Sequence, residues 1–336
     1  MTQPDLPDEH PVDTSSVSGP SSSTPRPIAD RTAVLFVGLV AGFAVGVSFH
    51  TSPPVAVPTM ATTPAVTAPA TGDAPTTPPA ATPPSVPAAT MPAPSGPATI
   101  DPRVLARVKA DGRIRVGVFG DSIGNGMFEA LYYQLPRDQG YDVLRFSKEA
   151  TGFTRYHTLD LAQRAREQLA ADPVDIAVIS FGANDAQDMW EEGHLHPLLG
   201  DSWRRIVGER LDRFVATARS TGATVYWIGL PVMRDAQMDA TMQAMDAFYA
   251  DHMRRLGVTF VDTRPLSVDA QGRYNAYLPD AKTGRPALMR TPDGIHLIGV
   301  GYRRLTAGVA DDIRAFAAKA RAAAGVPAPQ ANEAAR

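Results

Sequence analysis

The 336-residue chain contains no cysteine, and that absence removes several kinds of chemistry. Disulfide bonds, thiolate nucleophiles and thiolate zinc sites all need cysteine, so none of them operates here. Concentrated positive charge is lacking as well. Residues 1–100 carry a net charge of −4, which leaves +1 for residues 101–336. A nearly neutral chain argues against binding to nucleic acid, which depends on clustered lysine and arginine.

The first part of the chain also lacks the composition of a folded domain. Residues 1–31 offer almost no apolar side chains to bury and predict a disordered tail. Residues 32–49 are almost wholly apolar and approach the ~17–25 residues of a membrane-spanning helix. Because Arg26 and Arg31 precede this segment, the positive-inside rule predicts a transmembrane anchor with its N-terminus in the cytoplasm. A cleavable signal peptide is the alternative, but so long and acidic a leader favours an uncleaved anchor.

Residues 50–100 are rich in proline, alanine and threonine and include fourteen prolines. Such a segment favours polyproline II and predicts a linker that would reach on the order of 150 Å. The final residues, 324–336, return to alanine, proline and glutamine and predict a second disordered tail. The folded part is therefore expected at 101–323.

Within residues 101–323, apolar β-branched runs alternate with amphipathic stretches. The run at 174–181 is nearly continuous in valine and isoleucine, which is typical of a strand buried on both faces of a parallel sheet. The alternation predicts an α/β fold, a three-layer α/β/α sandwich with a mainly parallel sheet. Residues 262–292 are expected to be irregular. The expected strands are 114–119, 141–147, 174–181, 224–230 and 258–261, and the expected helices are 123–135, 159–170, 203–220, 238–256 and 300–323.

Ser122 stands where the first strand breaks into glycines, in Gly120-Asp121-Ser122. A sharp strand-to-helix turn would present its hydroxyl at the first turn of the following helix, where free backbone N–H groups favour an oxyanion. Ser122 is thus a candidate nucleophile, with a simple N-cap as the alternative. A serine nucleophile needs a base, and His296 precedes the last helix with Asp293 three residues before it.

Four blocks resemble those of the SGNH (GDSL-like) hydrolases and occur in the same order. They are Gly120-Asp121-Ser122, a loop glycine at Gly152, Gly182-Ala183-Asn184-Asp185 and Asp293-Gly294-Ile295-His296. The resemblance covers residues 112–318 and implies a flavodoxin-like fold and acyl-ester chemistry. It implies Ser122 as nucleophile, His296 as base and Asp293 as the residue that orients the base. The implied oxyanion donors are the backbone N–H groups of Ser122 and Gly152 and the side-chain amide of Asn184, with Gly140 as an alternative to Gly152.

The chain is most similar to a membrane-anchored bacterial envelope branch of this family, whose substrate is unknown. The similarity rests on Ala150-Thr151-Gly152-Phe153, on Gly229-Leu230-Pro231-Val232-Met233-Arg234 and on the block around His296. The nucleophile elbow of α/β-hydrolases also fits Gly120-x-Ser122-x-Gly124. In those enzymes, however, the serine follows several strands and the acid lies far from the histidine in sequence.

Several other polar residues are expected at the same rim of the sheet. Two arginines among them would suit an anionic group on a substrate, and no cofactor or metal is expected. The residues assigned to substrate binding are Asp121, Arg155, Asp185 and Arg234. His194 and His196 are predicted to lie in a solvated loop rather than in a metal site. The three tryptophans, Trp190, Trp203 and Trp227, are expected in the core.

The function expected from these features is a serine esterase that hydrolyses acyl esters, foremost O-acetyl groups, on an envelope polysaccharide or glycan. Its catalytic domain would face the periplasm or cell exterior from a single-pass anchor in the inner membrane. An acyltransferase is the first alternative, in which a glycan hydroxyl instead of water accepts the acyl group from Ser122. A non-catalytic envelope-binding module is the second.

Overall fold

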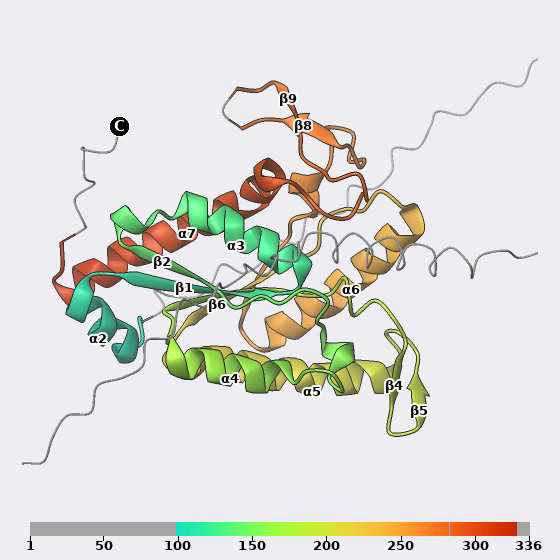
Figure 1. The fold of residues 1–336 in the computed structure, drawn as a ribbon, viewed down its shortest axis with the longest axis horizontal. Coiled ribbons are helices and arrows are strands. Elements are labelled where there is room, and N and C mark those ends of the chain that lie inside the picture. The colour runs from blue at the N-terminus through green and yellow to red at the C-terminus, as the bar shows by residue number, and fades with distance from the viewer. Residues whose placement is uncertain (1–98, 282, 328–336) are drawn as a thin grey trace, which may run out of the picture. The chain divides into compact units, whose positions relative to one another are not determined.

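The computed structural model of the chain describes residues 99–281 and 283–327 (Figure 1). The tail predicted at 1–31, the anchor at 32–49 and almost all of the linker at 50–100 lie outside these residues. Across the described ranges, every helix is too short or too polar to cross a bilayer.

The centre of the fold is a five-stranded sheet in the order β2-β1-β3-β6-β7 with every neighbouring pair parallel. All residues of β3 are buried, because the sheet is covered on both faces and β3 lies in its middle. The expected α/β fold with a mainly parallel sheet is confirmed. The strands are β1 (Ile114–Gly120), β2 (Tyr141–Arg145), β3 (Ile176–Ser180), β6 (Thr224–Ile228) and β7 (Thr259–Val261).

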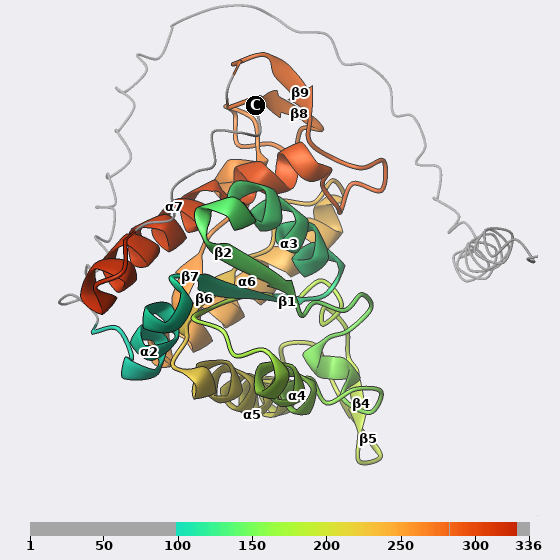
Figure 2. The ribbon, with the colours of Figure 1, turned by 60° about the vertical axis from the view of Figure 1, so that its left-hand side comes forward.

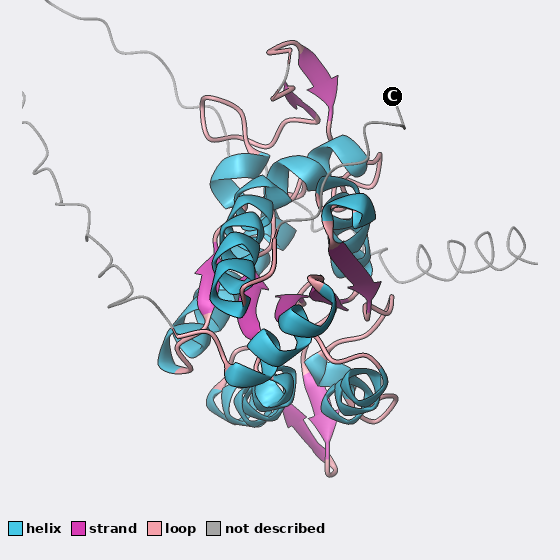
Figure 3. Cartoon of the chain, turned by 90° about the vertical axis from the view of Figure 1, so that its left-hand side faces the viewer, coloured by secondary structure: helices cyan, strands magenta, loops and turns pink. Residues whose placement is uncertain are grey.

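Helices cover the two faces of the sheet (Figures 1 and 3). One face carries α3 (Ser122–Gln134) and α7 (Gly299–Ala324). These two pack closely because Gly126 has no side chain: a Cβ there would lie 2.1 Å from the Tyr302 ring. The other face carries α4 (Leu161–Ala171), α5 (Asp201–Ala218) and α6 (Ala236–Arg255). Aromatic rings of α5 and α6 pack on each other, and they also pack on rings of β1 and β6.

Short elements appear that the sequence did not indicate. A helix, α2 (Pro102–Asp111), precedes β1, and two antiparallel hairpins project from the body (Figure 2). One hairpin pairs β4 (Met189–Glu191) with β5 (His194–His196). The other pairs β8 (Tyr277–Pro279) with β9 (Pro286–Leu288), so the stretch 262–292 is not wholly irregular. The 3₁₀ turns are Arg137–Gln139, Phe153–Arg155, Arg219–Thr221 and Arg264–Ser267.

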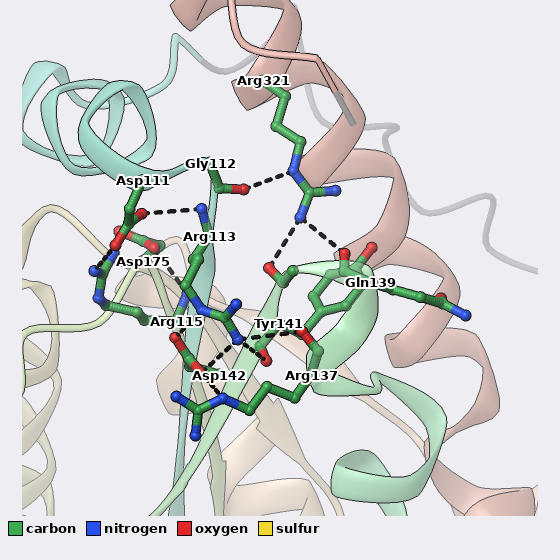
Figure 4. A network of polar contacts seen from close by, with 11 residues as sticks. Asp111, Gly112, Arg113, Arg115, Arg137, Gln139, Tyr141, Asp142, Asp175 and Arg321 are labelled. Carbon is green, nitrogen blue, oxygen red and sulfur yellow. Dashed lines mark hydrogen bonds and ion pairs between the residues drawn. The ribbon is translucent and has the colours of Figure 1, made fainter. Parts of the chain in front are cut away.

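A polar network fastens the amino ends of β1 and β2 to α7 (Figure 4). The buried Arg321 of α7 donates to the carbonyl oxygens of Gly112 at 2.9 Å, Gln139 at 3.2 Å and Gly140 at 2.9 Å. Its guanidinium also lies 5.3 Å from the centre of the Tyr141 ring. This end of the sheet is therefore closed by side-chain-to-backbone bonds, and the opposite end is left for the loops that carry the candidate site.

Candidate active site

Ser122 lies at the carboxyl end of β1, on the first turn of α3. Gly120 adopts a φ of +154°, and a Cβ there would lie 2.3 Å from the carbonyl oxygen of Ser180 on β3, so only glycine permits this turn. Asp121 is the N-cap of α3, because its carboxylate accepts the backbone N–H of Ile123 at 2.9 Å. The helix is capped by Asp121, and the Ser122 hydroxyl is left for another partner.

That partner is His296. The Ser122 Oγ lies 2.8 Å from His296 Nε2, and His296 Nδ1 lies 2.7 Å from Asp293 Oδ2. Three side chains from the two ends of the folded region thus form one row of hydrogen bonds. The imidazole remains 34% exposed, so the row stands at the surface, where an external molecule can reach it.

A tight turn between Arg290 and Leu297 holds the histidine and the aspartate. The other oxygen of Asp293, Oδ1, accepts from the Thr291 hydroxyl at 2.6 Å and from the backbone N–H groups of Ile295 and His296 at 2.8 and 3.0 Å. Burial alone would raise the pKa of the Asp293 carboxyl, but hydrogen bonds from Thr291, His296 and the backbone outweigh burial and hold this pKa well below its usual range. Asp293 therefore stays ionised and faces the imidazole as an acceptor.

Asn184 and Gly152 lie in loops that meet beside this row. The Asn184 amide donates to Asp121 Oδ2 at 3.2 Å and to the carbonyl oxygen of Thr151 at 3.1 Å. A Cβ on Gly152 would lie 2.5 Å from Asp185 Oδ1, so glycine is required there. Gly140, the alternative donor, directly precedes β2 at the opposite end of the sheet, where its carbonyl oxygen accepts from Arg321. The structure therefore favours Gly152 over Gly140.

Asp121 and Asp185 differ from the expectation of substrate contact, because both are fully buried. Asp185 accepts from the backbone N–H of Thr154 at 2.8 Å, from its hydroxyl at 3.0 Å and from the Tyr249 hydroxyl at 3.1 Å. Burial raises the pKa of both carboxyls, that of Asp121 to about 7. Asp121 holds the Asn184 amide, and Asp185 holds the loop that follows Gly152.

The two arginines assigned to substrate binding have different surroundings. Arg155 is partly buried and donates to the carbonyl oxygen of Ala150 at 2.9 Å. Arg234 is exposed, and its backbone N–H donates to the carbonyl oxygen of Gly294 at 3.0 Å. Its side chain runs along Gly294, where an added Cβ would lie 2.7 Å from Arg234 Nε. Within the described residues the Arg234 guanidinium makes no hydrogen bond or ion pair, so it stands beside the turn with free donors.

The remaining predictions concern the β4–β5 hairpin and the tryptophans. His194 and His196 lie in β5, and among the described residues no three metal-ligating side chains come together. Trp203 and Trp227 are buried as expected, but Trp190 is 68% exposed. It points outward because it alternates with the buried Met189 along a three-residue strand. The prediction of a core position for Trp190 was wrong.

Sequence reasoning did not identify Thr291 or Arg290, although both contact the turn that carries His296. Thr291 has a local signal, because a threonine two residues before an aspartate can bond to its carboxylate. Arg290 donates to the carbonyl oxygen of Ile295 and has no comparable signal, because its role depends on burial by distant segments.

Comparisons with known proteins give one family and a set of similar folds. Residues 115–312 match the model of a family described as "Protein of unknown function (DUF459)". No curated protein matches the chain in sequence.

Several solved structures are similar over most of their own length. A GDSL-like lipase from Bacteroides thetaiotaomicron is 17% identical, with a TM-score of 0.43 over 64% of this chain and 98% of the lipase. A carbohydrate acetylesterase from Sinorhizobium meliloti is 15% identical, with a TM-score of 0.41 over 61% of this chain and all of the esterase. The periplasmic domain of a lipopolysaccharide acetyltransferase from Salmonella ser. Paratyphi A is 10% identical, with a TM-score of 0.44 over 63% of this chain and 88% of that domain.

Proposed function

This chain belongs to the DUF459 family, an SGNH-like family, and on that premise we propose that it is a serine esterase. The observation that carries the proposal is the row of hydrogen bonds from Ser122 through His296 to Asp293, at 2.8 and 2.7 Å. A serine hydroxyl, an imidazole and an ionised carboxylate in this order are the parts of a nucleophile activated by a base.

In the proposed reaction, Ser122 Oγ attacks the carbonyl carbon of an ester while His296 Nε2 takes the hydroxyl proton. Asp293 accepts a hydrogen bond from the Nδ1–H group of His296. The proton of the neutral imidazole therefore stays on Nδ1, and Nε2 is free to act as the base. His296 then gives its proton to the departing alkoxide, and an acyl-Ser122 remains. Water, deprotonated by the same imidazole, adds to this acyl group. The acyl–Oγ bond then breaks, His296 returns the proton to Ser122 Oγ, and the acid is released.

The tetrahedral intermediate carries a negative oxygen that needs donors. We assign the backbone N–H groups of Ser122 and Gly152 and the amide of Asn184 to this role. Asn184 supports the assignment because Asp121 and the Thr151 carbonyl already fix its amide beside Ser122. When the oxyanion forms, the Asn184 amide turns one of its hydrogens from these acceptors to the oxyanion.

The substrate that we propose is an O-acyl group, foremost acetyl, on an envelope glycan. Support comes from the sequence: an apolar segment at 32–49 followed by a proline-rich stretch would hold the esterase outside the inner membrane, where such glycans are found. Arg234 would bind an anionic group on the glycan, because its guanidinium is exposed beside the turn of His296. Arg155 would line the other side, next to the Gly152 loop.

Replacement of Ser122 tests the chemistry. Ser122→Ala should lower hydrolysis of a small activated acetyl ester by roughly 10⁴-fold or more, because no other hydroxyl of the described residues bonds to the imidazole. It should also abolish labelling by a serine-directed fluorophosphonate. Acetate release from envelope glycan fractions, measured by chromatography, should fall in parallel.

The matched control is Ser202→Ala, a serine near the start of α5 that bonds to no histidine in the described part of the chain. This variant should retain the activity and the labelling of the wild type. Equal activity of wild type and Ser122→Ala would remove Ser122 from the mechanism and the esterase proposal with it.

The anchor is tested separately. The full chain should sediment with inner membranes, and a chain that lacks residues 1–49 should not, because the apolar stretch at 32–49 would be gone. Protease added to spheroplasts should digest the catalytic domain if it faces outward. A catalytic domain that stays protected in intact spheroplasts would contradict the proposed orientation.

A further inference from the structure

Arg290 is a buried arginine directly at the base of the turn that carries Asp293 and His296. Its side chain is among the largest fully buried ones, at 1% exposure. Its Nη1 donates to the carbonyl oxygen of Ile295 at 3.1 Å, and its Nη2 donates to the carbonyl oxygens of Val232 at 2.6 Å and Ser267 at 3.4 Å. The guanidinium thus joins three segments that are far apart in the sequence.

No carboxylate forms an ion pair with Arg290 among the described residues, and its Nε has no hydrogen-bond partner. The Tyr274 ring lies 5.1 Å from the guanidinium carbon. Burial lowers the pKa of Arg290 below its usual value. Burial of a cation without a direct ion pair costs several kcal/mol, and three carbonyl oxygens and the more distant charges of Asp239 and Asp293 offset only part of that cost.

Arg290 joins the segments that lie next to His296 and support the turn that carries it. Ile295 immediately precedes His296, and Val232 belongs to the loop after β6. That loop is bonded to the turn a second time, by the Arg234 N–H to the Gly294 carbonyl oxygen at 3.0 Å. Ser267 supports the loop from below, because its hydroxyl accepts the N–H of Val232 at 2.9 Å. Arg290 is the centre of this support.

We propose that Arg290 is a positioning residue for the base: its fork holds the carbonyl oxygens of Ile295 and Val232 and thereby fixes His296 at bonding distance from Ser122. Arg290 itself touches neither the substrate nor the Ser122 hydroxyl. The inference rests on the proposed esterase function. Loss of the fork should leave substrate binding intact and slow the chemical step, since a displacement of about 1 Å can cost roughly 10²-fold in rate.

Arg321 provides a matched control within the same chain. It is also buried, donates to three backbone carbonyl oxygens and stacks on a tyrosine, at 5.3 Å (Figure 4). Its carbonyl partners, however, lie at the amino ends of β1 and β2, away from the site. A variant at Arg321 therefore loses the same kind of hydrogen bonds, but none of them holds the turn that carries His296.

The experiment compares Arg290→Met, Arg290→Lys, Arg321→Met and Arg321→Lys in the full chain. Circular dichroism and thermal unfolding give the folded fraction, and kcat and KM are measured with an activated acetyl ester below the lowest Tm. We expect kcat per folded molecule to fall roughly 10²-fold in Arg290→Met, with KM within about twofold of the wild type. Arg290→Lys, which keeps the charge and one donor direction, should recover part of kcat. The Arg321 variants should lose Tm and keep kcat.

Three results would overturn the proposal. They are a normal kcat per folded molecule in Arg290→Met, an equal loss of kcat in both Met variants, and a rise in KM that accounts for the whole effect. If Arg290→Met does not fold, the two Lys variants decide the question by the same comparison of kcat. Failure of this inference is distinguishable from failure of the esterase proposal, because Ser122→Ala would still be inactive.

Discussion

Two arginines lie against the turn that carries His296, and they differ in whether their guanidinium groups are free to bind a substrate. Arg290 is buried, and its Nη1 and Nη2 donate to backbone carbonyl oxygens. Arg234 is exposed, and only its backbone N–H is bonded to the turn, at Gly294. A side chain with occupied donors can shape a site, whereas one with free donors can bind what enters it.

Replacement of Arg234 should therefore change substrate preference. With Arg234→Ala, kcat/KM for an ester that carries a carboxylate near its acyl group should fall roughly tenfold, which corresponds to ~1.4 kcal/mol. For a neutral ester of the same size, kcat/KM should stay within about twofold, because that substrate offers no anion to the guanidinium. Steady-state kinetics on the matched pair of esters measures the ratio.

Arg254→Ala serves as the control because it also removes one exposed positive charge. Arg254 lies in the last turn of α6, and its partner Asp251 keeps a second arginine, Arg255. This variant should leave the ratio between the two esters unchanged. A constant ratio in Arg234→Ala as well would remove Arg234 from substrate recognition.

At the residue scale, the sequence identified the groups that occur in short motifs. Ser122, His296 and Asp293 are brought into one row of hydrogen bonds, and membership of DUF459 confirms the resemblance to SGNH hydrolases. The supporting residues were missed or given other roles. Asp185 was assigned to substrate binding, yet its carboxylate accepts hydrogen bonds from Thr154 and Tyr249. These partners come from distant segments of the chain, so the burial of Asp185 could not be predicted from its position in the sequence.

The loop between β6 and α6 is the element on which the turn of His296 rests. Asp246 of α6 accepts the N–H of Leu230 with both carboxylate oxygens, at 2.9 and 3.1 Å. Asp239, also of α6, accepts the N–H of Met233 at 2.8 Å. The helix thus fixes the loop at two points, and the loop in turn carries Val232 and Arg234 to the turn.

Asp246 gives this element a pH-dependent stability. Burial raises the pKa of its carboxyl to about 7, whereas the unfolded chain releases the same proton near pH 4. Between these values the folded state binds more protons, so this contribution to stability is complete below about pH 4 and is lost as the pH rises toward 7. Compared with wild type, Asp246→Asn should gain free energy of unfolding over this window, by an amount on the order of a few kcal/mol. Urea denaturation at several pH values measures the difference.

Asp138→Asn is the matched control, because Asp138 is exposed on a 3₁₀ turn. The difference in free energy of unfolding between Asp138→Asn and wild type should not vary between about pH 4 and 7. Asp121, whose pKa is raised by burial to a similar value, remains in both Asp246→Asn and wild type and so cancels from the comparison. If the difference in free energy of unfolding between Asp246→Asn and wild type is constant between pH 4 and 7, Asp246 is ionised in the folded state throughout this range, which would contradict the prediction.

At the element scale, the sequence predicted all five strands of the main sheet, because runs such as β3 are buried on both faces and keep a strong local pattern. It did not predict the two hairpins. Each of their strands has three residues, too few for an alternating pattern, and the cross-strand partners Trp190 and Leu195 are both exposed. Exposed apolar pairs give no signal that distinguishes them from core residues.

At the scale of the whole molecule, the two ends of the sheet have separate tasks. The amino ends of the strands are fastened by Arg321 and by the ion pair between Arg107 of α2 and the buried Asp175, at 2.8 Å. The carboxyl ends carry Ser122, Asn184 and the loop after β6. The order of elements predicted this division, because loops at the carboxyl ends of parallel strands form the sites of such folds. The fastening residues could not be predicted, since they bond mainly to backbone groups of distant segments.

Under the proposed function, the separation of 174 positions between Ser122 and His296 also sets when the esterase becomes active during its own synthesis. At ~5–20 residues per second, the histidine leaves the ribosome roughly 10 to 35 seconds after the serine. Helix α7, which packs on α3, begins later still, at Gly299. If Ser122 and His296 act as proposed, a nascent chain carries an ordinary, unactivated Ser122 hydroxyl until His296 has emerged, and the growing polypeptide does not attack esters in the compartment of synthesis before then.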